Sequence, residues 1–146
     1  MAQRRALVIH GPNLNMLGVR QPEVYGTSTV DDHVATVRSV LAPAGWTVDS
    51  FVSNSESEIV GAIQGARGQV DALVVNAGAL THYSWALHDA LNVFEGTKIE
   101  VHISNPGARE EFRHTSVIAP VVNGTVAGFG GLGYELAARA ILSIAG

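Results

Sequence analysis

Short runs of apolar residues alternate along the chain with segments whose apolar residues recur every three or four positions. The runs are rich in Val, Ile and Leu, which is typical of strands buried on both faces of a parallel sheet. Five strands are therefore expected, at 6–9, 46–52, 72–75, 98–103 and 124–129.

Helices are expected after these strands, and two of them have N-terminal caps that the sequence reveals. Thr29 can cap a helix whose apolar residues run from Val30 to Leu41. Ser55 and Glu58 have the spacing of a capping box at the start of a second helix. Two further helices are expected, one at 84–94 and one that Gly131-Leu-Gly133 opens and that contains Ile144.

Strand and helix alternate from end to end, with no internal repeat and no linker. This pattern predicts one α/β domain over residues 1–146, with a parallel sheet between two layers of helices. A linear α/β unit of this size most often has the flavodoxin-like strand order 2-1-3-4-5. The expected fold is therefore a flavodoxin-like three-layer sandwich with a five-stranded parallel sheet.

Composition excludes several classes of protein. The 146 residues include no cysteine, which rules out a disulfide framework, a cysteine-based zinc site and a cysteine nucleophile. Nine Lys and Arg against 13 Asp and Glu give a net charge of −4, so no basic surface for nucleic acid is expected. No apolar run is long enough to span a membrane, and the one that ends at His10 is too short for a signal peptide, so a cytoplasmic location is expected.

Only 15% of the residues are charged, which is few for a small domain. Because the cores of subunit interfaces are depleted in charge, association between copies of the chain is expected.

Residues Gly11 to Ser28 break all periodicity. Eighteen residues without a regular element usually form a functional loop or lid in a compact domain. Arg20 precedes Tyr25 by five residues and can fold back over its phenol ring. A neighbouring arginine favours the phenolate form, which would make Tyr25 a usable base near neutral pH, although spacing alone favours an ordinary packed tyrosine.

Polar side chains follow three of the predicted strands. The segments are His10 to Asn15, Asn76 to His82 and His102 to Asn105. One such turn would be an ordinary end of a strand, since Asn and Gly are common in turns. The carboxyl ends of parallel strands meet at one edge of the sheet, where ligands bind in open α/β folds, so three such turns together favour a site.

Four separated motifs follow one another along the chain. They are Gly11-Pro-Asn-Leu-Asn-Met-Leu-Gly18 with Arg20, Pro22 and Tyr25-Gly26; Asn76-Ala-Gly78 with Thr81-His82 and Ser84; Glu100-Val-His-Ile-Ser-Asn105; and Arg109-Glu-Glu-Phe-Arg-His114. With these motifs, and with Gly133-Tyr134, the chain resembles the type II 3-dehydroquinate dehydratases over nearly its whole length. Four motifs in register are far more specific than a single Gly-rich turn.

The resemblance implies that the protein dehydrates 3-dehydroquinate to 3-dehydroshikimate by anti elimination, in the shikimate pathway or in quinate breakdown, with no metal and no organic cofactor. Tyr25 would remove the C2 proton, with Arg20 favouring its phenolate form. Asn13 would hold a water that stabilises the enolate oxygen. His102, oriented by Glu100, would protonate the leaving C1 hydroxyl.

The resemblance also implies how the substrate is held and how the chain assembles. The backbone N–H groups of Ile103 and Ser104, with the Ser104 hydroxyl, would bind the substrate carboxylate. The ring hydroxyls would be bound by Asn76, His82 and Arg113. Asp89 matches an aspartate that reaches the site from a neighbouring subunit, in dodecamers built from trimers.

Elementary chemistry favours the same base and the same acid, and it favours a reaction without an imine between substrate and lysine. A proton next to a ketone is weakly acidic, so a base and enolate stabilisation must act together. Glu100 and His102 lie two residues apart on a strand and so share one side. A Schiff base is not expected, because Lys98, the only lysine, lies at the start of a strand, away from the expected site.

The other histidines and several departures from the family pattern need their own interpretation. His10 replaces a common asparagine and either touches substrate or only packs, His33 is expected on the solvated surface of a helix, and His88 and His114 are expected in structural or interface roles. No histidine has metal-ligand spacing. The departures in or near the motifs are Gln21, Tyr83, Trp85, His88 and Pro106-Gly107.

Two alternatives remain open at this stage. One is a flavodoxin-like module that binds flavin or a nucleotide, although the turn after the first strand holds Pro12 and two asparagines instead of a phosphate-binding nest. The other is a catalytically weak relative of the dehydratase that is retained for binding or regulation.

Overall fold

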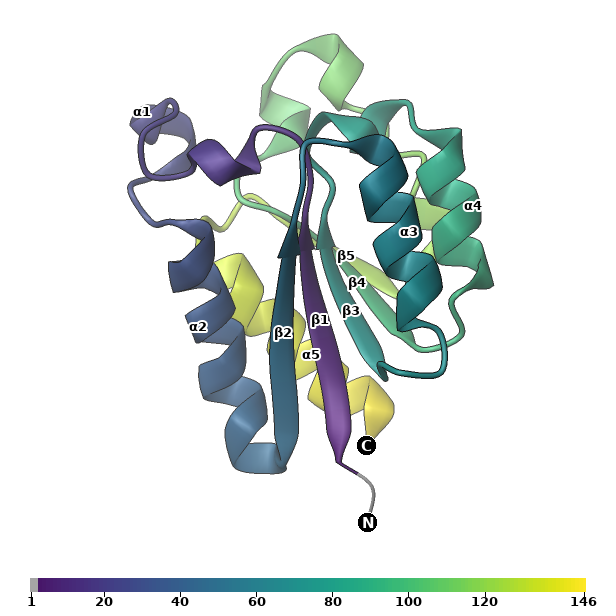
Figure 1. Ribbon diagram of the computed structural model, residues 1–146. Helices are drawn as coiled ribbons and strands as arrows, with labels where there is room; N and C mark the ends of the chain where they lie inside the picture. The colour runs from purple at the N-terminus through teal and green to yellow at the C-terminus, as the bar shows by residue number, and fades with distance from the viewer. Residues whose placement is uncertain (1–2) are drawn as a thin grey trace.

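A computed structural model describes residues 3–146 and contains one five-stranded parallel sheet in the order β2-β1-β3-β4-β5 (Figure 1). The strands are β1 Arg4–His10, β2 Trp46–Val52, β3 Ala72–Asn76, β4 Thr97–His102 and β5 Gly124–Ala127. The predicted fold class and strand order are confirmed. Each of the five predicted strands is present, with shifts of a few residues at the ends.

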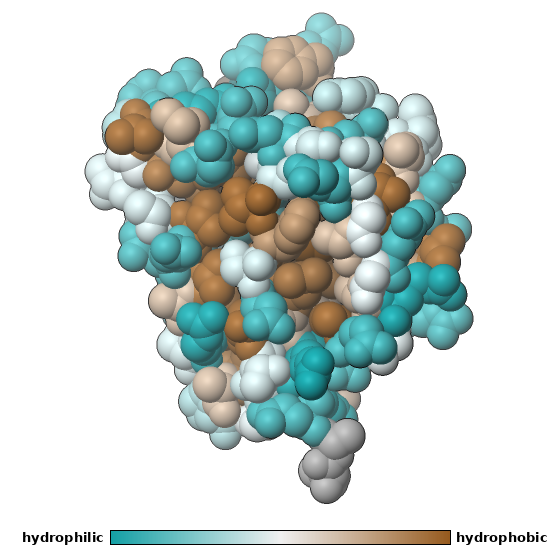
Figure 2. Space-filling model, in the orientation of Figure 1, coloured by the Kyte–Doolittle hydropathy of each residue, from teal (hydrophilic) through white to brown (hydrophobic). Residues whose placement is uncertain are grey.

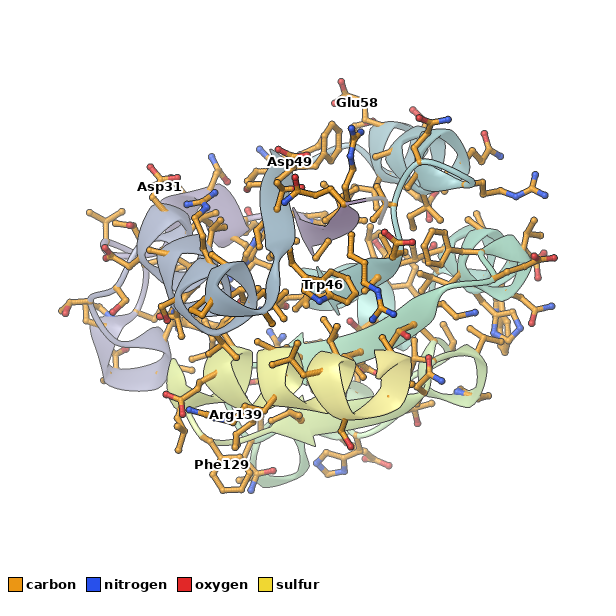
Figure 3. The ribbon with its side chains drawn as sticks, turned by 90° about the horizontal axis from the view of Figure 1, so that it is seen from below. Asp31, Trp46, Asp49, Glu58, Phe129 and Arg139 are labelled. Atoms are coloured by element: carbon orange, nitrogen blue, oxygen red, sulfur yellow. The ribbon has the colours of Figure 1, made fainter. Side chains whose placement is uncertain are left out.

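Helices cover both faces of the sheet, which makes three layers (Figure 1). The helices are α1 Pro22–Tyr25, α2 Val30–Leu41, α3 Glu56–Ala66, α4 Trp85–Val93 and α5 Leu132–Ala145. Helices α2 and α5 pack on one face around a core that includes the buried Trp46, which Figure 3 shows between β2 and α5. Helices α3 and α4 bury a second core on the other face, so the central strands are apolar on both sides.

The two predicted N-caps differ in how completely they form. Thr29 and Asp32 make a full capping box, in which each side chain accepts a hydrogen bond from the other residue's backbone N–H. Ser55 accepts from the Glu58 N–H, but the Glu58 carboxylate accepts from the Ser53 hydroxyl instead of returning to Ser55. The Ser53 hydroxyl donates to the Glu58 carboxylate and accepts from the Ser55 N–H. Because both groups are already paired with Ser53, only half of the predicted box at Ser55 is present.

Two segments depart from the expected elements. The loop from Gly11 to Ser28 is not wholly irregular, since it contains a 3-10 turn at Leu14–Met16 and the short helix α1. The last strand ends at Ala127, two residues earlier than predicted, because Gly128 has a φ of +93° and turns the chain away. Phe129, expected in the strand, is instead 59% exposed near the start of α5 (Figure 3).

The turns after β1 and β3 meet in backbone contact. A Cβ at Gly11 would lie 2.4 Å from the Ala77 carbonyl oxygen, and a Cβ at Gly78 would lie 2.9 Å from the Pro12 carbonyl oxygen. Gly78 also has a φ of +59°. Only glycine fits at these two positions, so the closeness of the two turns at the carboxyl edge depends on them.

Figure 2 shows apolar residues along the middle of one face, where β2 forms the edge of the sheet between α2 and α3. Within residues 3–146, no helix is both long and apolar enough to cross a membrane.

His33 is buried, so its predicted place on the solvated surface is wrong. Its ring is only 3% exposed and stacks on Tyr134 of α5, with 4.4 Å between ring centroids. The ring is polar, but position 33 follows Val30 by three residues and precedes Val37 by four, so it lies on the apolar face of α2, which α5 covers. His10, at the end of β1, is also fully buried and lies against Tyr134.

The free energy of unfolding is expected to fall as the pH drops below the ordinary histidine pKa of 6.5. Burial lowers the pKa of His10 to about 3 and also lowers the pKa of His33. The unfolded chain therefore binds more protons than the folded chain below pH 6.5, at a cost of at most about 1.4 kcal/mol per histidine for each pH unit.

The variant His33→Phe keeps an aromatic ring against Tyr134 and removes one titrating group. Its free energy of unfolding should depend less steeply on pH than that of the wild-type chain. Urea unfolding from about pH 5 to 7.5 measures both slopes, and parallel slopes would contradict an ionisable buried ring at position 33.

Candidate active site

A cavity of about 220 Å³ opens at the carboxyl edge of the sheet, above β1, β3 and β4. Nine of the residues predicted from the sequence line it: Asn13, Arg20, Tyr25, Asn76, His82, His102, Ile103, Ser104 and Arg113. The volume suits a ligand smaller than a drug-sized molecule. The polar ends of three strands and the loop that contains α1 therefore build one small site.

Tyr25 is held by two arginines. Its ring is 8% exposed, and the guanidinium carbon of Arg20 lies 4.8 Å from the ring centroid, as the sequence predicted. The hydroxyl itself accepts a hydrogen bond of 2.9 Å from Nη1 of Arg109, which also lies 3.1 Å from the Ser104 hydroxyl. A phenolate at Tyr25 would thus meet a positive charge at its oxygen and another at its ring.

Arg109 is the residue that sequence reasoning missed. It lies 84 residues from Tyr25 along the chain, in a loop of 3-10 turns without helical or strand periodicity. Its place at the head of the Arg-Glu-Glu-Phe-Arg-His motif was visible, but nothing in that spacing shows which side chain the guanidinium reaches. The loop after β4 carries it back over the cavity.

His102 and Glu100 form the expected pair. Glu100 is fully buried and its carboxylate accepts three hydrogen bonds, from His102 Nε2 at 2.5 Å, Ser116 Oγ at 2.9 Å and Thr125 Oγ1 at 3.1 Å. These donors stabilise the carboxylate in an otherwise apolar layer. The pairing uses Nε2 of His102, so Nδ1 is the ring nitrogen left for a ligand.

Asn13 and Asn76 come from the two turns that touch. Asn13 has a φ of +70°, and its backbone N–H donates to the side chain of Asn54 at 2.8 Å. Asn76 is 4% exposed, and its amide donates to the Tyr134 hydroxyl at 3.1 Å and accepts from the Gly78 N–H at 3.3 Å. Both side chains line the cavity.

The loop after β4 closes the far wall. His82 Nδ1 donates to the Thr115 carbonyl at 2.8 Å, and its ring meets Phe112 edge-on. Arg113 pairs with Glu110, which holds the pKa of the Glu110 carboxyl below its usual range. His88, on α4, and His114, in the loop itself, donate to the carbonyls of Val117 and Arg109, so both side chains hold this loop in place.

The structure does not bring Asp89 into the cavity of its own chain. Asp89 is exposed on α4 and lines a groove between α3 and α4 with Gln64 and Arg67. Tyr83 and Trp85 at the start of α4 are also exposed, at 61% and 63%. Any part that Asp89 plays in a cavity must therefore be in that of another copy.

Lys98 lies at the opposite end of β4 from the cavity, as predicted. Its amine donates to the carbonyls of Leu91 and Phe94 at 2.8 and 2.7 Å, and burial lowers its pKa. Among residues 3–146, no three His, Asp or Glu side chains form a group that could hold a metal ion. Arginines, histidines and a tyrosine line the cavity, and the amine of Lys98, the only lysine in the sequence, lies away from it.

The turn after β1 offers no amides to a phosphate. The Gly11 N–H donates to the Asn76 carbonyl, Leu14 donates to Gly11, and Asn13 donates to Asn54. Pro12 has no N–H to offer. With these three N–H groups engaged and a proline between them, the turn does not form a nest for a flavin or nucleotide phosphate, which argues against the module that binds such a ligand.

Known proteins share the sequence of this chain over nearly its whole length. The sequence profile of the family "Dehydroquinase class II" matches residues 4–142. The chain is 49% identical over 142 residues to a 3-dehydroquinate dehydratase of Roseiflexus castenholzii, covering 97% of this chain and 90% of the relative. It is 47% identical over 140 residues to that of Campylobacter hominis, covering 96% and 90%.

Solved structures show the same likeness in three dimensions. The type II dehydroquinase of Propionibacterium acnes superposes with a TM-score of 0.90 at 42% identity, covering 97% of this chain and 99% of that one. A 3-dehydroquinate dehydratase-like protein of Bifidobacterium longum gives 0.73 at 28% identity, covering 98% of both chains. By fold, sequence and the motifs that line its cavity, the chain belongs to the class II dehydroquinase family.

Proposed function

We propose that the protein is a 3-dehydroquinate dehydratase, which removes water from 3-dehydroquinate to give 3-dehydroshikimate. One observation carries the proposal: Tyr25, with an arginine on its oxygen, and His102, with a buried carboxylate on Nε2, line the same small cavity. Elimination needs both a base and an acid, one at each carbon of the bond that becomes double.

Tyr25 acts as the base. As a phenolate it takes the proton from C2, and the electron pair moves onto the C3 ketone oxygen to give an enolate. Arg109 and Arg20 stabilise the phenolate before the step. Asn13 holds the water that donates to the enolate oxygen, which lowers the barrier as charge develops there.

His102 acts as the acid. The enolate returns its electron pair, the double bond forms, and the C1 hydroxyl leaves with a proton from the imidazolium as water. Glu100 keeps Nε2 protonated and fixes the ring, so Nδ1 delivers the proton. The amides of Ile103 and Ser104 bind the substrate carboxylate, while Asn76, His82 and Arg113 bind the ring hydroxyls. The substrate is thereby held with C1 toward His102 and C2 toward Tyr25.

An ultraviolet assay for the enone product tests the proposed activity. The purified protein is mixed with 3-dehydroquinate, without added metal or cofactor and with a chelator present. Absorbance should rise, and borohydride added with substrate should not inactivate the protein, because Lys98, the only lysine, lies at the other end of β4 from the cavity and cannot form an imine there. No enone from a folded protein would reject the dehydratase and favour the relative retained for binding.

Tyr25→Phe is expected to lower kcat by about 10²–10⁴-fold with little change in melting temperature. The substitution keeps the buried ring and removes the ionisable oxygen. Tyr83→Phe is the matched control, because Tyr83 is 61% exposed and outside the cavity. A Tyr25→Phe protein that melts normally and turns over like the wild type would remove this tyrosine from the mechanism.

Arg109→Ala is expected to lower kcat by about 10–100-fold, the effect of a lost hydrogen bond to a charged oxygen. Arg20→Ala should lower kcat by a smaller factor, because Arg20 contacts the ring of Tyr25 and not its oxygen. Arg109→Lys should restore only part of the rate, as lysine lacks the planar fork. A wild-type kcat in both Arg109→Ala and Arg20→Ala would refute the roles of the two arginines.

We also propose that the active protein is a homo-oligomer, a dodecamer built from trimers, in which Asp89 completes a neighbour's site. Three features support this assembly. The chain has few charged residues, large apolar side chains such as Val19, Trp85 and Leu132 are more than half exposed, and Asp89 lies outside its own chain's cavity. The cytoplasmic location expected from the sequence stays a prediction.

Asp89→Ala is expected to lower activity although every other site residue is retained, whereas Asp31→Ala, on the outer side of α2 (Figure 3), should not. Refolding Asp89→Ala together with Tyr25→Phe should then recover part of the activity, because mixed contacts pair an intact Tyr25 with an intact Asp89. Light scattering gives the size of the assembly. A fully active monomer, or no recovery in mixed assemblies, would contradict the shared site.

A further inference from the structure

Behind the cavity lies a chain of three polar side chains, two of which have no part in the proposed mechanism. The hydroxyl of Tyr134, on α5, lies 2.7 Å from His10 Nε2 and 3.1 Å from Asn76 Nδ2. Tyr134 and His10 are fully buried, and only Asn76 lines the cavity. Burying three polar groups in an apolar layer is costly unless their hydrogen bonds are well matched.

The direction of each hydrogen bond follows from the backbone. The Gly78 N–H can only donate, so the atom that it meets at 3.3 Å is the carbonyl oxygen of Asn76. The amide nitrogen of Asn76 must then face Tyr134 and donate to its oxygen. The Tyr134 proton is left to point at His10, which accepts it on Nε2.

His10 can accept because it is neutral. Burial, and the nearness of His33, lower its pKa to about 3. Its proton then lies on Nδ1, for which residues 3–146 provide no hydrogen-bond partner. In the other tautomer Nε2 would carry the proton and donate to Tyr134, so that both the Tyr134 hydroxyl proton and His10 Nδ1 would lack a partner. That tautomer leaves two buried groups unpaired instead of one.

The ring of Tyr134 is itself fixed. It stacks on His33 at 4.4 Å and 11°, and its centroid lies 5.5 Å from that of His10. Burial raises the pKa of Tyr134, so its hydroxyl keeps the proton that it gives to His10. The oxygen of Tyr134 is therefore a fixed acceptor at the back of the cavity.

We propose that Tyr134 is a positioning residue for Asn76, with His10 as the acceptor that orients the Tyr134 hydroxyl. With one Nδ2–H directed to Tyr134 and the oxygen held by Gly78, the Asn76 amide is prevented from flipping. Its second N–H is then always the group presented to a ring hydroxyl of 3-dehydroquinate. The inference rests on the proposed function and adds two residues that do not touch the substrate.

A double-mutant cycle between Tyr134 and Asn76 tests the inference. Tyr134→Phe keeps the ring in its stack and should lower kcat/KM by roughly 10-fold, mainly through a higher KM, because the Asn76 amide is free to turn. In the Asn76→Ala background the same substitution should change kcat/KM by less than about 2-fold. Equal losses in both backgrounds, or no loss in the wild-type background, would overturn the inference.

Variants at His10 give a second and independent readout. His10→Phe removes the acceptor and should raise KM as Tyr134→Phe does, whereas His10→Gln supplies a carbonyl acceptor and should restore most of the affinity. Melting temperatures show whether a His10 variant is simply less stable. A loss of activity that came only from lower stability would be the same with and without the Asn76 side chain. If Tyr134→Phe fails to fold, the His10 pair decides: equal KM values for His10→Phe and His10→Gln would reject the chain of hydrogen bonds.

The outcome is separable from that of the proposed function. Failure of the proposed function appears in the wild-type chain, which would then form no enone from 3-dehydroquinate. Failure of the inference appears only as a wild-type chain that is active and variants at Tyr134 and His10 that do not change its KM.

Discussion

The backbone contact between the turns after β1 and β3 is the constraint on which the site depends. Gly11 and Gly78 let the backbones of these two turns come so close that no side chain fits between them. β1 and β3 are neighbours in the parallel sheet, and their last residues, His10 and Asn76, are paired. The turns that follow them therefore start side by side at the same edge. Asn13 and Asn76 are thereby fixed on adjacent walls, and the loops that carry Tyr25 and Arg109 close over them.

Most of the fold could be predicted because its signals are local. Each central strand is a short apolar run, and Thr29 and Ser55 begin helices through contacts three residues away. The positions of Glu100 and His102 followed from the two-residue period of a strand. Ser53 competes with Ser55 for the Glu58 carboxylate, so the capping-box spacing predicted only one of the two hydrogen bonds correctly.

The features that were missed depend on contacts between distant segments. His33 shares the apolar face of α2 with Val30 and Val37, but its polar ring suggested solvent, and the ring that covers it, Tyr134, comes from α5. Arg109 reaches Tyr25 across 84 residues through a loop with no periodic signal. For the same reason the sequence left the role of His10 open, since its partner Tyr134 comes from the last helix.

The lone lysine has a practical consequence. The Lys98 amine closes the end of α4 by donating to two of its last carbonyls. A reagent that acylates this amine would remove the positive charge and leave the end of a helix without its donor. Amine-directed labels and cross-linkers that react at Lys98 would therefore report on the fraying of α4 as much as on surface access.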